Sequence, residues 1–308
     1  MLKKIYNNKP LIGLIVFSII VSFLNPRFLS MGNILNVLRQ TSINSVIAIG
    51  MTLVILTGGI DLSVGSILAL TGAMGASLIA NGVNPVLAIF IAIVLGAIFG
   101  IFNGLLISYA KLQPFIVTLV TMTLLRGATL VFTDGKPIPV RDGGDFFDNI
   151  GGGYILDIPI PIYIMIALFI AGYYILNNLK FGRYIYAIGG NEEATKLSGV
   201  NTSKYKTLVY GVAGALSALA GVIITSRLGS AQPTAGSGYE LDAIAAVVLG
   251  GTSLAGGIGS IAGTALGAII IGVLGNALNL LNVSSYYQMM VKAAVILIAV
   301  LIDKKSSK

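Results

Sequence analysis

The residues with the clearest chemical potential are Asp61, Ser63 and Ser66, in a glycine-rich stretch between two long apolar runs. A carboxylate at the centre of a bilayer costs about 2.5 to 3.5 kcal/mol on insertion scales, so such acids usually face a protein interior or a wet cavity. The carboxylate could carry a coupling ion or bind a polar solute. We therefore expect these three side chains to line a transport pathway.

The elements that must position this carboxylate are two helices joined by a flexible break over residues 58–66. The apolar run 43–58 gives a helix of about 24 Å, shorter than the apolar slab of about 30 Å, so we expect the break to lie below the membrane surface. Gly58, Gly59 and Gly65 are the expected hinge residues. Single glycines also allow close helix packing, which is the alternative interpretation for each of them.

A second break of the same texture spans residues 238–260, where Gly250 and Gly251 are expected hinges and Thr252 and Ser253 could offer hydroxyls to a polyol. Paired short, glycine-interrupted apolar segments indicate the translocation site of a transporter. The segment 240–250 is long enough for half a membrane only. Its acids, Glu240 and Asp242, suit the positive end of a half-helix and could be simple caps.

Two basic residues fall inside predicted spans, Arg126 and Lys292. Arg126 either extends toward the outer interface or pairs with an interior acid such as Asp61 or Glu240. We include it among the candidate pathway residues.

Composition assigns the chain to the all-α membrane proteins: 56% of its 308 residues are hydrophobic, 10% are charged, and the mean hydropathy is +0.94. Apolar runs near twenty residues favour helices over a β-barrel. With neither Cys nor His, we expect no metal or cofactor, and the dispersed charges do not form a nucleic-acid-binding patch. About ten spans are predicted, at residues 11–24, 42–58, 64–80, 85–109, 115–132, 159–178, 207–226, 240–250, 258–280 and 286–302.

Loop charges predict the orientation of a single transmembrane domain, residues 1–308. The acidic loop 133–158 is expected outside, where it could be a docking ledge, and the basic loop 179–206 inside. Both termini are then cytoplasmic, in a multi-pass membrane protein. The first apolar run lacks a small-residue cleavage site and is interpreted as a retained span.

The basic loop contains a short segment with a helix signal at each end. Asn191 can cap a helix whose first turn holds Glu192 and Glu193, and Gly199 can end it. So short a helix is marginal alone, so we expect it to be held between spans and to press on another protein. A solvated connector is the alternative. The segment comprises Gly190, Asn191, Glu192, Glu193, Ala194, Thr195, Lys196, Leu197 and Ser198.

Several strings resemble the permease subunits of bacterial sugar importers driven by ATP-binding cassettes, the ribose permease group. They are GIDLSVGS at 59–66, LLRG at 124–127, GRYIYA at 182–187, GGNE at 189–192, SAQPTA at 230–235, GYELDAIAAVVLGGTS at 238–253 and NLLNVSSYYQ at 279–288. The resemblance covers nearly the whole chain, and the last string resembles the ribose member in particular.

This resemblance implies a type II ABC importer-like fold, with residues 189–199 as the coupling helix on the ATPase subunit. It also implies a second copy of the permease, a cassette ATPase, an extracytoplasmic sugar-binding protein and a monosaccharide substrate, ribose in particular. The chain lacks the phosphate-binding pattern G-x-x-x-x-G-K-[ST], so we expect ATP hydrolysis in another chain, and no enzymatic activity here.

The main alternative is an ion- or proton-coupled secondary transporter of a small polar solute with Asp61 as the carrier of the coupling charge. An intramembrane enzyme is disfavoured because the sequence offers no nucleophile or metal constellation.

Overall fold

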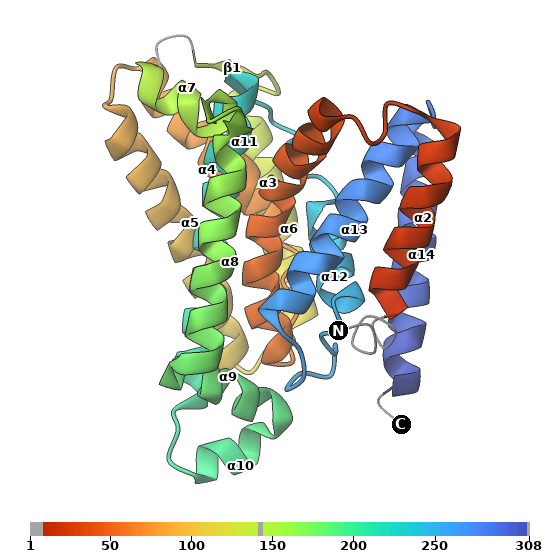
Figure 1. Ribbon diagram of the computed structural model, residues 1–308. Coiled ribbons are helices and arrows are strands. Elements are labelled where there is room, and N and C mark those ends of the chain that lie inside the picture. Colours follow the sequence, from red (N-terminus) through yellow and green to blue (C-terminus); the bar gives the residue numbers. More distant parts are fainter. Residues whose placement is uncertain (1–8, 141–143, 307–308) are drawn as a thin grey trace.

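The computed structural model describes residues 9–140 and 144–306, and in this part the chain is a bundle of helices (Figure 1). The two ends of the chain, residues 1–8 and 307–308, lie outside the described residues. So do positions 141–143 of the acidic loop, which include Arg141 and Asp142. The membrane-embedded helices are α2 (Lys9–Leu24), α3 (Met31–Leu56), α4 (Val64–Ala80), α5 (Pro85–Ser108), α6 (Pro114–Thr133), α8 (Ile160–Asn178), α11 (Thr202–Leu228), α12 (Tyr239–Leu249), α13 (Ile261–Leu280) and α14 (Ser285–Ser306).

Each of the ten predicted spans coincides with one of these helices, so the all-α membrane fold is confirmed. In the described part of the chain, six helices are long and apolar enough to cross a membrane: α3, α5, α6, α8, α11 and α13. Helix α12 has 11 residues, about 16 Å, which agrees with the predicted half-helix.

The prediction that a short helix sets the depth of the first break is wrong. Helix α3 begins at Met31, where Ser30 caps it by accepting a hydrogen bond from the Asn33 amide, and it continues for 26 residues. At 1.5 Å per residue this is about 39 Å, longer than the apolar slab. The polar stretch before residue 42 therefore belongs to the same helix, and Asp61 is recessed because other helices cover it.

A row of glycines holds two central helices together. Gly96, Gly100 and Gly104 on α5 face α11, where added Cβ atoms would meet the backbones of Gly214, Tyr210 and Thr207. Without a hydrophobic driving force between helices, such close backbone approach is a main source of packing energy in a bilayer. This seam places α11 in the middle of the bundle, beside α3 and α4.

The acidic loop 133–158 contains no span, as predicted, but it is more ordered than a plain loop. It contains helix α7 (Gly144–Gly152) and strands β1 (Ile138–Pro139), β2 (Tyr154–Ile155) and β3 (Ile158–Pro159). Strand β1 pairs antiparallel with β4 (Ser230–Ala231), and β2 pairs with β3. Ser226 of α11 donates to the Phe147 carbonyl, which fastens α7 to the bundle.

The basic loop 179–206 is almost entirely helical. Its elements are α9 (Lys180–Gly190), α10 (Glu192–Leu197) and the first turn of α11. In Figure 1, α9 and α10 project from one end of the bundle, and α7 and β1 lie at the other end. The two loops with opposite charge are therefore on opposite sides of the membrane-spanning body.

Candidate translocation and coupling site

Asp61 lies in the connection between α3 and α4 and has no exposed surface within the chain. Its Oδ1 accepts hydrogen bonds from the Ser63 amide at 2.9 Å and from the Ser63 hydroxyl at 2.6 Å. Its Oδ2 is buried and has no hydrogen-bond partner among the described residues. The carboxylate therefore fixes the turn that begins α4.

Ser63 extends this contact into a buried polar chain that crosses three helices. The Ser63 hydroxyl accepts from the Asn103 amide group at 2.9 Å, and the Thr121 hydroxyl donates to Asn103 Oδ1 at 2.6 Å. Ser66 donates to the Ser63 carbonyl at 2.8 Å and is itself fully buried. The sequence analysis did not identify Asn103, although an asparagine in an apolar span beside the glycine row is a signal of an interior polar contact.

The two predicted breaks lie against each other. A Cβ added at Gly65 would meet the Gly236 carbonyl, and one added at Gly256 would come within 3.0 Å of the Gly58 amide nitrogen. Gly58 has φ 78° and Gly236 has φ 71°, in the left-handed region that disfavours other residues. Gly59 packs against the Tyr210 hydroxyl. A displacement of one break must therefore move the other.

The remaining pathway candidates of the second break are also buried. Thr252 has no exposed surface, its hydroxyl oxygen has no partner among the described residues, and Ser253 is 4% exposed. Gly250 packs on the backbone of Gly263, and Gly251 has φ 84° with open space around it. Thr252 and Ser253 are thus buried in the turn between α12 and α13, whereas Gly251 lies on its exposed side.

Arg126 turns inward from α6 toward the segment before α12. Its guanidinium donates to the carbonyls of Pro233 at 3.0 Å and Ala235 at 2.8 Å. In the described part of the chain it forms no salt bridge, and Glu240 borders the same cavity of about 460 Å³. Backbone carbonyls, and not Asp61, therefore satisfy the arginine, which holds the second break in place.

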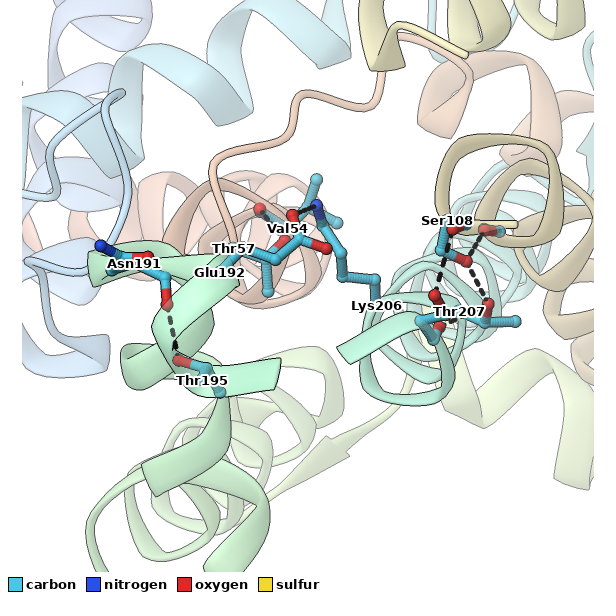
Figure 2. A network of polar contacts seen from close by, with 10 residues as sticks. Val54, Thr57, Ser108, Asn191, Glu192, Thr195, Lys206 and Thr207 are labelled. Carbon is cyan, nitrogen blue, oxygen red and sulfur yellow. Dashed lines mark hydrogen bonds and ion pairs between the residues drawn. The ribbon is translucent and has the colours of Figure 1, made fainter. Parts of the chain in front are cut away.

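The predicted double-capped helix is confirmed as α10. Asn191 Oδ1 accepts from the Ala194 amide at 2.9 Å, the Thr195 hydroxyl donates to the Asn191 carbonyl at 2.7 Å, and Gly199 has φ 84° at the end. Figure 2 shows Asn191 and Thr195 of this segment, with Glu192 next to Lys206 at the start of α11.

An ion pair joins α10 to α11. Lys206 Nζ lies 2.6 Å from Glu192 Oε2, with side-chain exposures of 15% and 34% (Figure 2). Burial alone would raise the pKa of Glu192, but the hydrogen bond and charge of Lys206, with the charge of Lys111, outweigh it and lower that pKa. At the foot of α11, the hydroxyls of Ser108 and Thr207 lie 2.7 Å apart and join α5 to α11.

Apart from the contact between Glu192 and Lys206, most of the surface of α10 is exposed. Thr195 is its one buried residue, whereas Glu193, Ala194, Lys196, Leu197 and Ser198 are exposed, and Leu197 is 89% exposed. Almost the whole surface of α10, including the side chain of Leu197, is therefore available for contact with another protein.

The end of α9, directly before α10, touches both breaks through a junction of backbones. We call it the glycine junction, and it comprises Leu56, Gly58, Gly189, Gly190, Gly256 and Gly257. The Gly257 amide donates to the Leu56 carbonyl at 3.0 Å. A Cβ added at Gly189 would overlap that carbonyl and the Gly257 nitrogen. Tyr186 of α9 also donates to the Gly259 carbonyl at 2.9 Å. The end of α9 is therefore in direct backbone contact with the end of α3 and the second break.

We expect Asp61→Ala to destabilise the protein more than Asp61→Asn. Asparagine keeps an oxygen that can accept from Ser63, whereas alanine leaves two buried donors without an acceptor, at roughly 1 to 3 kcal/mol each. Thermal unfolding of the detergent-solubilised protein should show a clearly lower Tm for the alanine variant. Equal Tm values for the two variants would exclude the anchoring role of the carboxylate oxygen.

Comparisons with known proteins agree with this arrangement. Residues 33–300 match the family described as the permease component of the branched-chain amino acid transport system. The ribose import permease protein of Haemophilus influenzae is 59% identical over 294 residues, covering 95% of this chain and 91% of its own. The Bacillus subtilis ribose import permease protein is 58% identical, covering 97% and 92%.

A D-allose transport system permease protein of Escherichia coli is 38% identical, covering 96% of this chain and 90% of its own. No solved structure matches the chain significantly. The family match spans nearly all of the described helices, including α10 and both breaks. The chain belongs to the family of transport-system permease components described for branched-chain amino acid transport.

Proposed function

We propose that this chain is the membrane-spanning permease of an ATP-binding-cassette importer that carries ribose into the cell. The identity of 58% and 59% to ribose import permease proteins along almost the whole chain supports ribose, whereas the D-allose permease protein is only 38% identical. The permease provides the path, and the sugar leaves it chemically unchanged.

The observation that carries the mechanism is that helix α10 is mostly exposed and directly follows the glycine junction. A helix of six residues that buries only Thr195 in its own chain has surface for a partner, and we assign that partner as a cassette ATPase. ATP-driven closure of the ATPases would displace α10 and α9, and the glycine junction would pass this displacement to both breaks, opening the path to either side in turn.

The assembly that we propose has two copies of this permease, the ATPase and an extracytoplasmic sugar-binding protein. The basic loop with α9 and α10 then faces the cytoplasm, in line with the positive-inside rule, and so do both termini. The ledge of α7 with β1 and β4 is on the outer side, where the sugar-binding protein would dock. ATP hydrolysis belongs to the ATPase, because no phosphate-binding loop occurs in this sequence.

Asp61, Ser63, Ser66, Arg126, Thr252 and Ser253 remain our candidates for the wall of the path near its narrowest point. Because they are buried or held by backbone contacts in this conformation, contact with the sugar requires the breaks to separate. Gly58, Gly59, Gly65, Gly250 and Gly251 would allow that separation.

The test is ribose uptake into proteoliposomes that contain this chain with its ATPase and binding protein. We expect uptake that needs ATP and all three components. Uptake by this chain alone, driven by a proton or sodium gradient, would contradict the proposal and favour a secondary transporter using Asp61.

A further inference from the structure

A polar cavity of about 190 Å³ lies between α3, α12, α13 and α14, so that helix α12 of the second break forms one of its walls. Its lining includes the side chains of Gln40, Asn44, Asp242, Asn276, Asn279 and Lys292. Gln40 and Asn279 are exposed, so the cavity opens on the surface of the chain. Four helices thus direct amide and charged groups to one place inside a protein whose helices are otherwise strongly apolar.

Two buried polar atoms on the wall of the cavity lack partners. The Thr41 hydroxyl oxygen and Asn44 Oδ1 are buried, and neither has a hydrogen-bond partner among the described residues. Thr41 is only 4% exposed. A buried polar group without a compensating hydrogen bond costs roughly 1 to 3 kcal/mol, and more in a bilayer, where lipid offers no partner. These atoms therefore indicate that the cavity normally holds a hydrogen-bonding occupant.

The other polar groups are held in fixed orientations. Asn33 and Asn276 exchange two hydrogen bonds of 2.9 Å, and Gln288 donates to Asn279 Oδ1 at 2.8 Å. Because their side chains are already positioned, little conformational entropy is lost when a ligand binds. These groups therefore form a preorganised polar site and are not mobile surface amides.

The charges in the cavity cancel. Lys292 Nζ lies 2.7 Å from Asp242 Oδ2, and the two side chains are 31% and 12% exposed. Asp242 and Lys292 are the two charged residues of the lining, so the cavity has no net charge to attract an ion. Amides both donate and accept hydrogen bonds, as sugar hydroxyls do. A neutral polyol fits these groups better than an ion or a lipid tail.

The size of the cavity also favours a small neutral polyol as its ligand. Sites for drug-sized ligands run from roughly 300 Å³ upward, so about 190 Å³ suits a smaller molecule such as a pentose. We propose that this cavity is a binding station for the transported monosaccharide, in which Asn44, Thr41 and the Asp242–Lys292 pair contact its hydroxyls. The inference rests on the proposed function, and it places the sugar on the α3–α12–α13–α14 wall, a location that the sequence analysis did not consider.

A substitution that fills the cavity tests this directly. Gly275 lines the cavity, and a Cβ built there has no atom within 4 Å, so Gly275→Met can enter the empty space without a backbone clash. Gly32→Met is the matched control, since Gly32 also has open space but is outside the cavity. With ATPase and binding protein present, we expect Gly275→Met to lower ribose uptake at least tenfold, and Gly32→Met to leave it unchanged.

Asn44→Ala provides a second, milder test. We expect the KM for ribose, with the sugar supplied at increasing concentrations of loaded binding protein, to rise at least fivefold while assembly with the ATPase and basal ATP hydrolysis stay normal. If the KM of Asn44→Ala or the uptake by Gly275→Met equals that of the wild type, the cavity is not a binding station for the sugar and holds water instead. If Gly275→Met fails to assemble, Asn44→Ala decides. Absence of ribose uptake by the wild-type complex, with uptake of another solute, would instead contradict the proposed function.

Discussion

Leu197→Asp should abolish productive binding of the ATPase and reduce ribose uptake to background. Leu197 is 89% exposed on α10, whose neighbouring residues, Lys196 and Ser198, are exposed as well. An apolar anchor buried by a partner contributes about 2 kcal/mol or more at a hot spot, and a carboxylate in the same place must be desolvated. We expect the affinity for the ATPase, measured with the solubilised permease, to fall at least thirtyfold, about 2 kcal/mol.

Leu156→Asp is the control for this substitution. Leu156 is 87% exposed, has φ 50°, which aspartate tolerates, and lies in the loop between β2 and β3 at the opposite end of the bundle. It repeats the change from leucine to aspartate on an equally exposed side chain, so ATPase affinity should remain at the wild-type value. Equal effects of both variants, or no effect of Leu197→Asp, would refute α10 as the docking helix. Circular dichroism should show unchanged helix content in both.

The local signals in the sequence were sufficient for most of the fold. Runs of apolar residues bounded by Pro, Asn and Gly predicted ten spans, and each is a helix. The cap at Asn191 and the stop at Gly199 depend on residues a few positions apart, so they could be recognised without tertiary information.

The start of α3 could not be predicted in this way. Its first three turns contain Asn33, Asn36, Arg39 and Gln40, which look like an interfacial segment when hydropathy alone is considered. In the structure two of these groups have partners far away in the sequence: Asn33 pairs with Asn276 of α13, and Arg39 donates to the hydroxyl of Tyr154 in β2 at 3.1 Å. Polar residues in a span are stabilised by partners far away in sequence, and these partners are not visible in a single window.

The individual parts of the candidate site could be predicted from the sequence, but the contacts between those parts could not. The two breaks, their glycines and the capped helix α10 were predicted from the sequence, but their contact through Gly189, Leu56 and Gly257 joins segments more than 60 residues apart. The pairing of Asp242 with Lys292 was missed although one signal existed. A lysine within an apolar span calls for an acid partner, and Asp242 was interpreted only as a helix cap.

Gly189→Ala should uncouple ATP hydrolysis from transport. The methyl group would overlap the Leu56 carbonyl and the Gly257 nitrogen, both backbone atoms, which cannot rotate away as a flexible side chain can. The end of α9 must then separate from α3 and from the second break, although α10 keeps its cap and its exposed Leu197. We therefore expect ATPase binding near the wild-type level, and ribose imported per ATP hydrolysed at least tenfold lower.

Gly127→Ala is the matched control, because Gly127 is an exposed helical glycine of α6 with no atom within 4 Å of an added Cβ. Its ratio of sugar to ATP should be that of the wild type. Tyr186→Phe removes only the hydrogen bond to the Gly259 carbonyl, worth about 1 kcal/mol, so it should lower the ratio less than Gly189→Ala does. If Gly189→Ala transports normally, α9 does not act on the breaks through these backbones. If it binds no ATPase, the junction holds α10 in place and does not transmit its movement. A graded fall, from Tyr186→Phe to Gly189→Ala, with ATPase binding intact, is the result that only a mechanical connection at the glycine junction explains.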